Sequence, residues 1–142
     1  MNKQVFKIET IGEAKILSPI QMSINEGDGL ADYVEDSDKI YLNIDHKGRK
    51  NEEEEEVLEL AGPRKKIYFN PSRVHVAICT CGGICPGLNN VIRSVVRCFW
   101  YRYGVRRISG VPFGYLGLLA DSPWPMIELN PDIVDDIQEK GG

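Results

Sequence analysis

The sequence predicts an α/β protein in which a parallel sheet begins behind an irregular N-terminal arm. An apolar run over residues 74–79 ends in a glycine-rich turn, and an amphipathic helical pattern and a second β-branched run follow within residues 80–111. The charge is also uneven: residues 1–62 carry 7 Lys/Arg and 15 Asp/Glu, whereas residues 63–142 carry 10 and 6. We therefore divide the chain into an N-terminal extension, 1–72, and the first part of an α/β domain, 73–142.

The extension reads as short strands joined by loops. Residues 5–8 and 40–44 alternate enough to form strands, and a turn pattern follows the second of them. The five glutamates at 52–56 are typical of a solvated stretch or a short surface helix rather than of a metal site. The basic triplet at 64–66 is most simply a solvated hinge, because proline and glycine interrupt the chain on both sides of it.

The α/β part opens with one strand–helix–strand unit. Residues 74–79 form a strand that we expect to be covered on both faces, since parallel strands are rich in β-branched residues throughout. A helix then starts near Leu88 and stops at Gly104, and residues 105–111 form the second strand. The helix carries a stripe of apolar side chains at positions typical of a buried face: Leu88, Val91, Ile92, Val95, Val96, Phe99, Trp100 and Tyr103.

The last segment predicts a short extended piece and then a helix. Residues 126–129 are the extended piece, Asn130 is the expected N-cap, and Pro131 sits at the first helical position. Gly141 is the expected end of that helix. Since no strand follows, we expect an incomplete domain: the start of a doubly wound, Rossmann-like parallel sheet.

Composition narrows the function classes. No apolar run reaches the ~20 residues that span a membrane, and the N-terminus lacks a secretory signal, so we expect a cytoplasmic protein. The positive charge of residues 63–142 suits a small anionic ligand. It is too weak and dispersed for a nucleic-acid surface.

The four cysteines do not predict a metal centre. Cys79, Cys81 and Cys85 are spaced C-x-C-x3-C, which matches no usual zinc pattern, and a disulfide framework is not expected in a cytoplasmic chain. We expect them, with Cys98, to be small apolar core residues. His75 is expected to be a packed strand residue.

The candidate ligand site lies in two loops that follow the strands. Gly82 and Gly83 allow a phosphate close to the main chain, and Tyr115 lies in the loop after the second strand. If the strands are neighbours, both loops open into one crevice at the carboxyl ends of the sheet. The pattern is neither a dinucleotide fingerprint nor a P-loop, and a tight strand-to-helix turn explains the two glycines about equally well.

Two further arginines are weaker candidates. Arg93 and Arg97 lie four residues apart on the helix, where they are able to bind one anion together. Two arginines at this spacing are, however, more often solvated side chains on a helix surface. No catalytic base is identified from residue types alone.

Three segments resemble 6-phosphofructokinases of the plant-type, ATP-dependent subgroup, which carries a long N-terminal extension. Residues 77–93, AICTCGGICPGLNNVIR, resemble the opening of that family, and residues 110–118, GVPFGYLGL, resemble its next loop. Residues 59–69, ELAGPRKKIYF, resemble the lead-in of the subgroup. Cys81 and Ile84 stand where many bacterial members have serine and aspartate, which also points to the plant-type subgroup.

The resemblance implies phosphoryl transfer from ATP to fructose 6-phosphate in glycolysis, with Mg²⁺, by a homo-oligomeric enzyme when complete. It implies that Gly82 contacts the nucleotide phosphates and that Tyr115 lies beside the nucleotide. Arg93 and Arg97 match effector-binding positions of bacterial members. No residue of the chain matches a catalytic or magnesium-binding position.

The chain ends before the segments that would hold Mg²⁺ and the catalytic aspartate, so we expect a truncated form without kinase activity of its own. Two alternatives stay open from the sequence. One is a pyrophosphate-dependent phosphofructokinase, and the other is a non-catalytic fragment that acts only through binding or assembly.

Overall fold

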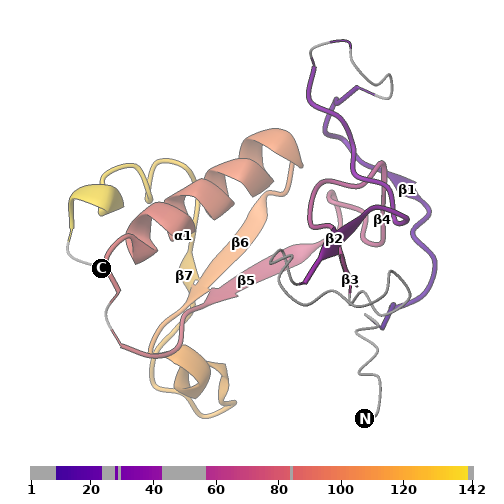
Figure 1. Cartoon of the computed structure of the whole chain (residues 1–142). Helices are drawn as coiled ribbons and strands as arrows, with labels where there is room; N and C mark the ends of the chain where they lie inside the picture. The colour runs from indigo at the N-terminus through magenta and orange to yellow at the C-terminus, as the bar shows by residue number, and fades with distance from the viewer. Residues whose placement is uncertain (1–8, 24–27, 29, 43–56, 84, 141–142) are drawn as a thin grey trace, which may run out of the picture. The chain divides into compact units, whose positions relative to one another are not determined.

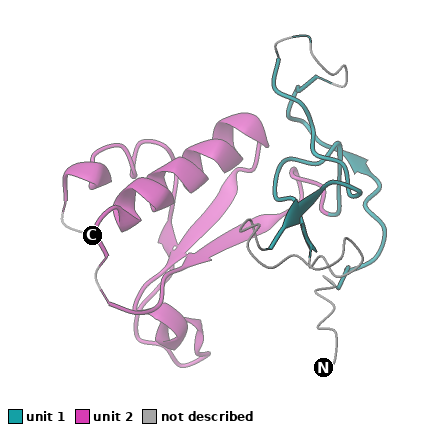
Figure 2. Cartoon of the chain, in the orientation of Figure 1, with its two compact units in different colours: residues 1–68 teal, residues 69–142 magenta. Residues whose placement is uncertain are grey.

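The computed structural model describes residues 9–23, 28, 30–42, 57–83 and 85–140. The chain divides into two compact units, residues 1–68 and residues 69–142, which are described separately (Figure 2). Their helices and strands are, in chain order, β1 (Ile16–Leu17), β2 (Lys39–Tyr41), β3 (Val57–Glu59), β4 (Lys66–Ile67), β5 (His75–Cys79), α1 (Leu88–Arg97), a π-helical turn (Cys98–Arg102), β6 (Arg107–Val111), a 3-10 helix (Gly114–Leu118), β7 (Ile127–Glu128) and a second 3-10 helix (Ile137–Glu139).

The second unit contains the predicted strand–helix–strand arrangement. β5 and β6 are parallel neighbours, with His75 opposite Arg107 and Cys79 opposite Val111. β7 pairs antiparallel with the other edge of β6, so the sheet order is β5-β6-β7. α1 lies across one face of this sheet (Figure 1). The α/β class and the parallel pair are confirmed, whereas a doubly wound sheet and an incomplete domain stay predictions.

The core of the second unit forms between α1 and the sheet. Val96 of α1 and Ile108 of β6 are almost fully buried, together with three side chains from the connecting segments: Val105, Leu129 and Val134. The predicted stripe is wrong at Val91, which is 58% exposed because it lies at the edge of the buried helix face. Full cover of β5 was also a wrong prediction: His75 and Ala77 are exposed, since α1 covers only one face.

Two glycines mark the ends of the helix. Gly87 precedes α1 with φ of +87°, in a left-handed conformation that a side chain would strain. The helix then widens into the π-helical turn, and the chain leaves it at Gly104, where φ is +69°. The predicted start near Leu88 and stop at Gly104 are therefore confirmed.

The terminal helix is a wrong prediction. Asn130 does act as a cap, because its side-chain oxygen accepts a hydrogen bond from the amide of Ile133 at 3.0 Å. The chain continues, however, as turns and the short 3-10 helix. Carbonyls of this segment bond to α1: the side-chain Nδ2 of Asn89 donates to the carbonyls of Ile137 (2.9 Å) and Lys140 (3.1 Å). These hydrogen bonds connect the segment to α1, and the predicted end at Gly141 lies outside the described residues.

The first unit holds two small antiparallel pairs. β1 pairs with β4, and β2 pairs with β3 with Lys39 opposite Glu59. The strand predicted over residues 40–44 is confirmed for residues 40 and 41, which lie in β2, and residues 43–44 are outside the described part of the chain. The predictions for residues 5–8 and 52–56 also lie outside it. None of the described residues of this unit is buried. Across the ranges that the structure describes, no helix is both long and apolar enough for a membrane span.

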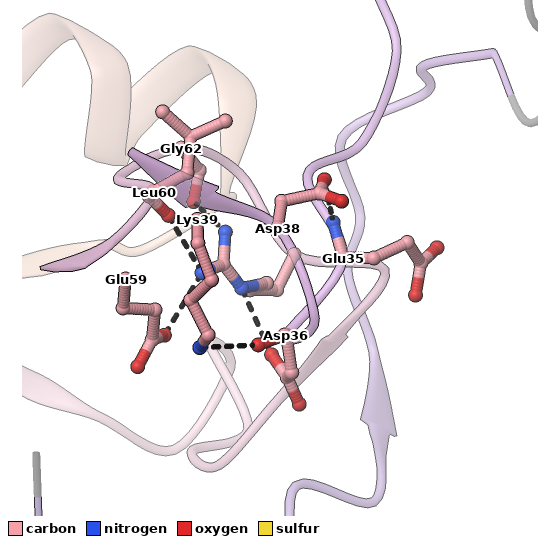
Figure 3. Close-up of polar contacts among 8 residues, drawn as sticks. Glu35, Asp36, Asp38, Lys39, Glu59, Leu60 and Gly62 are labelled. Atoms are coloured by element: carbon pink, nitrogen blue, oxygen red, sulfur yellow. Dashed lines mark hydrogen bonds and ion pairs between the residues drawn. The ribbon is translucent and has the colours of Figure 1, made fainter. Parts of the chain in front are cut away.

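Arg64 organises the first unit, so the expectation of a solvated hinge is wrong at this residue. Its guanidinium donates to the carboxylates of Asp36 and Glu59, each at 2.9 Å, and to the carbonyls of Leu60 (2.8 Å) and Gly62 (3.3 Å). Figure 3 shows these acceptors gathered around one point. The Arg64 side chain is only 20% exposed. Burial lowers the pKa of Arg64, but the hydrogen bonds to Glu59 and Asp36 outweigh it and raise that pKa overall.

Candidate functional site

The two glycine-containing loops meet where β5 and β6 end. Because Cys79 and Val111 are opposite each other in a parallel register, the chain leaves both strands at the same edge of the sheet. The loops enclose an open depression of about 620 Å³. Its lining comes from both loops: Thr80, Cys81, Gly82, Phe113, Gly114, Tyr115, Leu116 and Leu119. The expected single crevice is thus present, with Gly82 and Tyr115 on its wall.

The main chain is accessible at both candidate glycines. Gly82 has φ of +108°, and an ideal Cβ on Gly82 or Gly83 would meet no atom within 4 Å. Gly83 follows Gly82 but is not part of the lining. The depression carries no lysine, arginine or carboxylate side chain. Among the described residues, an anion bound there would therefore meet main-chain N–H groups and the hydroxyls of Thr80 and Tyr115 rather than charged side chains.

Gly114 brings the second loop close to the first. An ideal Cβ on Gly114 would lie 3.2 Å from the Thr80 carbonyl oxygen and 3.3 Å from the Cys81 sulfur, and φ there is +60°. Both the space and the backbone conformation therefore favour glycine.

The rim of the depression is aromatic. Tyr115 is 73% exposed, so its ring is available to a ligand. Phe113 has a left-handed backbone, with φ of +56°, and its ring packs on Trp124 with centroids 4.3 Å apart. The sequence prediction missed Phe113 and Trp124. An aromatic residue directly before a turn glycine was the available signal in the sequence, but strained non-glycine backbone is not visible there.

Arg93 and Arg97 lie away from this lining and bind a carboxylate of the chain itself. Asp135 accepts from Nη2 of Arg93 at 3.0 Å and from Nη1 of Arg97 at 3.2 Å, and its carbonyl accepts from Nε of Arg93 at 3.0 Å. The two arginines do converge on one anionic group, which fastens α1 to the C-terminal segment. Effector binding at these residues stays a prediction.

The cysteines were expected to be core residues, and that expectation is wrong. Cys81, Cys85 and Cys98 are exposed, and Cys79 is partly buried. Cys81 and Cys85 lie in the loop after β5, and Cys98 lies in the π-helical turn after α1. The sulfur atoms of Cys79 and Cys81 are 3.8 Å apart. Burial, followed by the hydrogen bond with Cys81, raises the pKa of the Cys79 thiol. Among the described residues no group of three His, Cys, Asp or Glu side chains is arranged to hold a metal ion.

His75 was expected to be packed, but it is exposed on β5. Its Nε2 lies 2.8 Å from the hydroxyl of Ser109, and its Nδ1 lies 3.5 Å from Nη2 of Arg107. Both partners belong to the neighbouring strand β6. His75 therefore joins two strands and lies outside the depression lining.

Comparison with known proteins gives one consistent group. Residues 75–142 match the family model described as phosphofructokinase. The chain is 50% identical over 138 residues to an ATP-dependent 6-phosphofructokinase of Borreliella burgdorferi, covering 96% of this chain and 31% of that protein. It is 52% identical over 82 residues to ATP-dependent 6-phosphofructokinase 7 of Arabidopsis thaliana, covering 58% of this chain and 16% of that protein.

A third relative is an ATP-dependent 6-phosphofructokinase of Entamoeba histolytica, 52% identical over 85 residues, with 60% of this chain and 19% of that protein covered. The chain thus spans about a third or less of the length of these relatives. The similarity reaches into the first unit in the Borreliella burgdorferi relative, since nearly the whole chain is covered there.

Proposed function

Because residues 75–142 belong to the phosphofructokinase family, we propose that the chain is the N-terminal part of an ATP-dependent 6-phosphofructokinase. The complete protein would transfer a phosphoryl group from ATP to fructose 6-phosphate, as a step of glycolysis in the cytoplasm. The observation that carries this proposal is the depression in which Gly82 and Tyr115 lie together. The names of the relatives favour ATP over pyrophosphate as the donor.

In this proposal the described residues bind the donor and do not perform the chemistry. The main chain at Gly82 and Gly83 faces the phosphates, since no Cβ blocks their approach. The exposed ring of Tyr115 lies against the nucleotide. Arg93 and Arg97 would bind an effector only where that ligand displaces Asp135.

Magnesium and the catalytic groups would come from elsewhere in the complete protein. The lining of the depression offers no carboxylate, the side chain that Mg²⁺ bound beside nucleotide phosphates prefers. Phosphoryl transfer also requires a group that positions the attacking hydroxyl. We therefore expect purified residues 1–142 to show no turnover of fructose 6-phosphate. From the family resemblance we also propose that the complete protein is a homo-oligomer.

The donor site is tested in the complete protein with a coupled assay that measures fructose 1,6-bisphosphate formation from ATP or from pyrophosphate. We expect activity with ATP, and KM for ATP about tenfold higher in Tyr115→Ala, since stacking of an aromatic ring on a base contributes about 1–3 kcal/mol. Tyr101→Ala is the matched control, because Tyr101 is 63% exposed and lies outside the depression.

A second variant tests the main-chain contact. Gly83→Ala places a methyl group in open space, so the protein should fold normally while kcat/KM for ATP falls about tenfold or more. Activity with pyrophosphate alone would contradict the choice of donor. Unchanged kinetics in both variants would contradict the placement of the donor site.

A further inference from the structure

Two thiols lie in contact at the end of β5. The sulfur atoms of Cys79 and Cys81 are 3.8 Å apart, and Cys81 is exposed. Only Thr80 separates the two residues, so their Cα atoms are at most about 7 Å apart. A disulfide spans Cα distances up to about 6.8 Å. A small movement of the backbone at Thr80 and Cys81 would therefore allow the two sulfur atoms to bond.

Cys81 also joins the two loops of the depression. It lines the depression next to Gly82. On its other side the sulfur packs against Gly114, where an ideal Cβ would lie 3.3 Å away. Drawing this sulfur toward Cys79 would shift the main chain at Gly82 and open the contact with Gly114. The bond state of Cys81 would thereby change the shape of the depression.

We propose that Cys79 and Cys81 form a redox-sensitive dithiol that a peroxide oxidises to a disulfide, and that this bond distorts the depression so that it binds its ligand less tightly. The second half rests on the proposed function, because it takes the ligand to be ATP. The first half concerns only the two sulfur atoms.

The chemistry balances in two steps. The Cys81 thiolate attacks one oxygen of hydrogen peroxide, the O–O bond breaks, and the departing hydroxide takes up the proton released by Cys81 to leave as water. The Cys79 thiol then attacks the resulting sulfenic acid sulfur. Its proton joins the departing hydroxide as a second water, and the S–S bond forms. The two thiols lose two electrons to the peroxide.

The roles of the two cysteines follow from their positions. Cys81 is exposed and meets the oxidant first. Cys79 is partly buried, and its raised pKa keeps it a thiol until a sulfenic acid forms beside it. A disulfide across one intervening residue is close to the geometric limit, so small-molecule thiols should reduce it readily.

The sequence offers internal controls for the experiment. Trypsin releases residues 74–93 as one peptide that contains Cys79, Cys81 and Cys85. Cys98 falls in the separate peptide of residues 98–102. Cys98 is exposed and thus reports unselective oxidation. In Cys85→Ser, Cys79 and Cys81 are the only possible pair in the longer peptide.

The complete protein is treated with hydrogen peroxide, alkylated and digested with trypsin, and the peptide masses are measured by mass spectrometry. We expect the 74–93 peptide of Cys85→Ser to become lighter by two hydrogen atoms and to resist alkylation, while the Cys98 peptide stays fully alkylated. Dithiothreitol should restore both thiols. Two free thiols after treatment, or oxidation of Cys98 at the same rate, would overturn the dithiol. A bond between Cys81 and Cys85 in the unmodified sequence would overturn it as well.

An assay of kinase activity then tests whether the disulfide weakens the use of ATP. We expect kcat/KM for ATP to fall about tenfold or more on oxidation, since a displacement of about 1 Å at a reacting site costs up to about a hundredfold. Dithiothreitol should restore the activity of the unmodified protein and of Cys85→Ser. In Cys79→Ser the Cys81 sulfenic acid has no partner thiol, so excess peroxide oxidises it further to the sulfinic acid, which dithiothreitol does not reduce. Equal, reversible loss in Cys79→Ser would overturn the switch. A complete protein without kinase activity would contradict the proposed function, whereas the peptide masses would still decide whether the dithiol forms.

Discussion

Different kinds of internal contact stabilise the two units of the chain, residues 69–142 and residues 1–68. All six buried apolar side chains of the described residues belong to the later unit, where Val96 and Ile108 bring α1 and the sheet together. The earlier unit has no buried residue in its described part, and its strands are joined by main-chain hydrogen bonds and by the four acceptors around Arg64. A unit built on apolar packing leaves a periodic pattern in the sequence, whereas a unit organised by one arginine does not.

The largest effect is expected from truncating the core of the later unit. Ile108→Ala removes a side chain that is 1% exposed and should lower the free energy of unfolding by about 2–5 kcal/mol. Both tryptophans, Trp100 and Trp124, lie in this unit, so their fluorescence during urea unfolding reports it. Ile133→Ala is the control: Ile133 is 50% exposed, and its truncation should change stability by about 0.5 kcal/mol or less. Equal losses in both variants would show that the unit does not depend on this core.

A smaller effect is expected at the polar centre of the earlier unit. Arg64→Ala removes two hydrogen bonds to carboxylates and should destabilise this unit by about 2 kcal/mol. Hydrogen exchange should accelerate at the amides of Val34 and Leu60, which bond to Pro63 and Asp38. Arg64→Lys separates charge from geometry, because lysine keeps the charge and loses the planar fork. If lysine restores full protection, charge alone holds the unit together.

The contact between α1 and the C-terminal segment should matter less still. Asp135→Asn weakens the bonds from Arg93 and Arg97, which are partly exposed, and we expect a loss of about 0.5 kcal/mol that shrinks at high salt. Asp132→Asn is the matched control on the same exposed segment. A loss above about 2 kcal/mol in Asp135→Asn would mean that this unit also depends on a polar centre, and the contrast between the units would fail.

The smallest effect concerns Asp28, a fully exposed group. The Ser23 hydroxyl, followed by the Leu30 amide, donates to the Asp28 carboxylate and lowers its pKa. Since the folded pKa lies below the unfolded one, the stabilisation is present above the ordinary pKa of an aspartate and is lost as the pH falls through the folded value. NMR titration should detect the lowered pKa, and Ser23→Ala should raise it. An unchanged pKa in Ser23→Ala would exclude the hydroxyl as its main cause.

The candidate site was partly predictable. The meeting of the two loops followed from the parallel strands, because residues opposite each other in register must deliver their loops to one edge. The contact between Gly114 and Cys81, the ring pair of Phe113 and Trp124, and the two thiols in contact did not follow. Each of these depends on side-chain positions across segments that sequence spacing leaves undefined.

The sequence by itself determined β5, α1 and β6, because apolar periodicity, β-branched runs and turn glycines act within a few residues of chain. Only the tertiary structure decided how the C-terminal segment folds: Asn130 caps a turn there, and the side chains of Asn89 and Arg93 donate to carbonyls of the segment and connect it to α1. The tertiary structure also decided the role of Arg64, which was expected to be a solvated hinge residue and instead donates hydrogen bonds to four acceptors of the earlier unit. Ion pairs and hydrogen bonds between residues far apart in sequence decided both outcomes, and a local pattern does not record them.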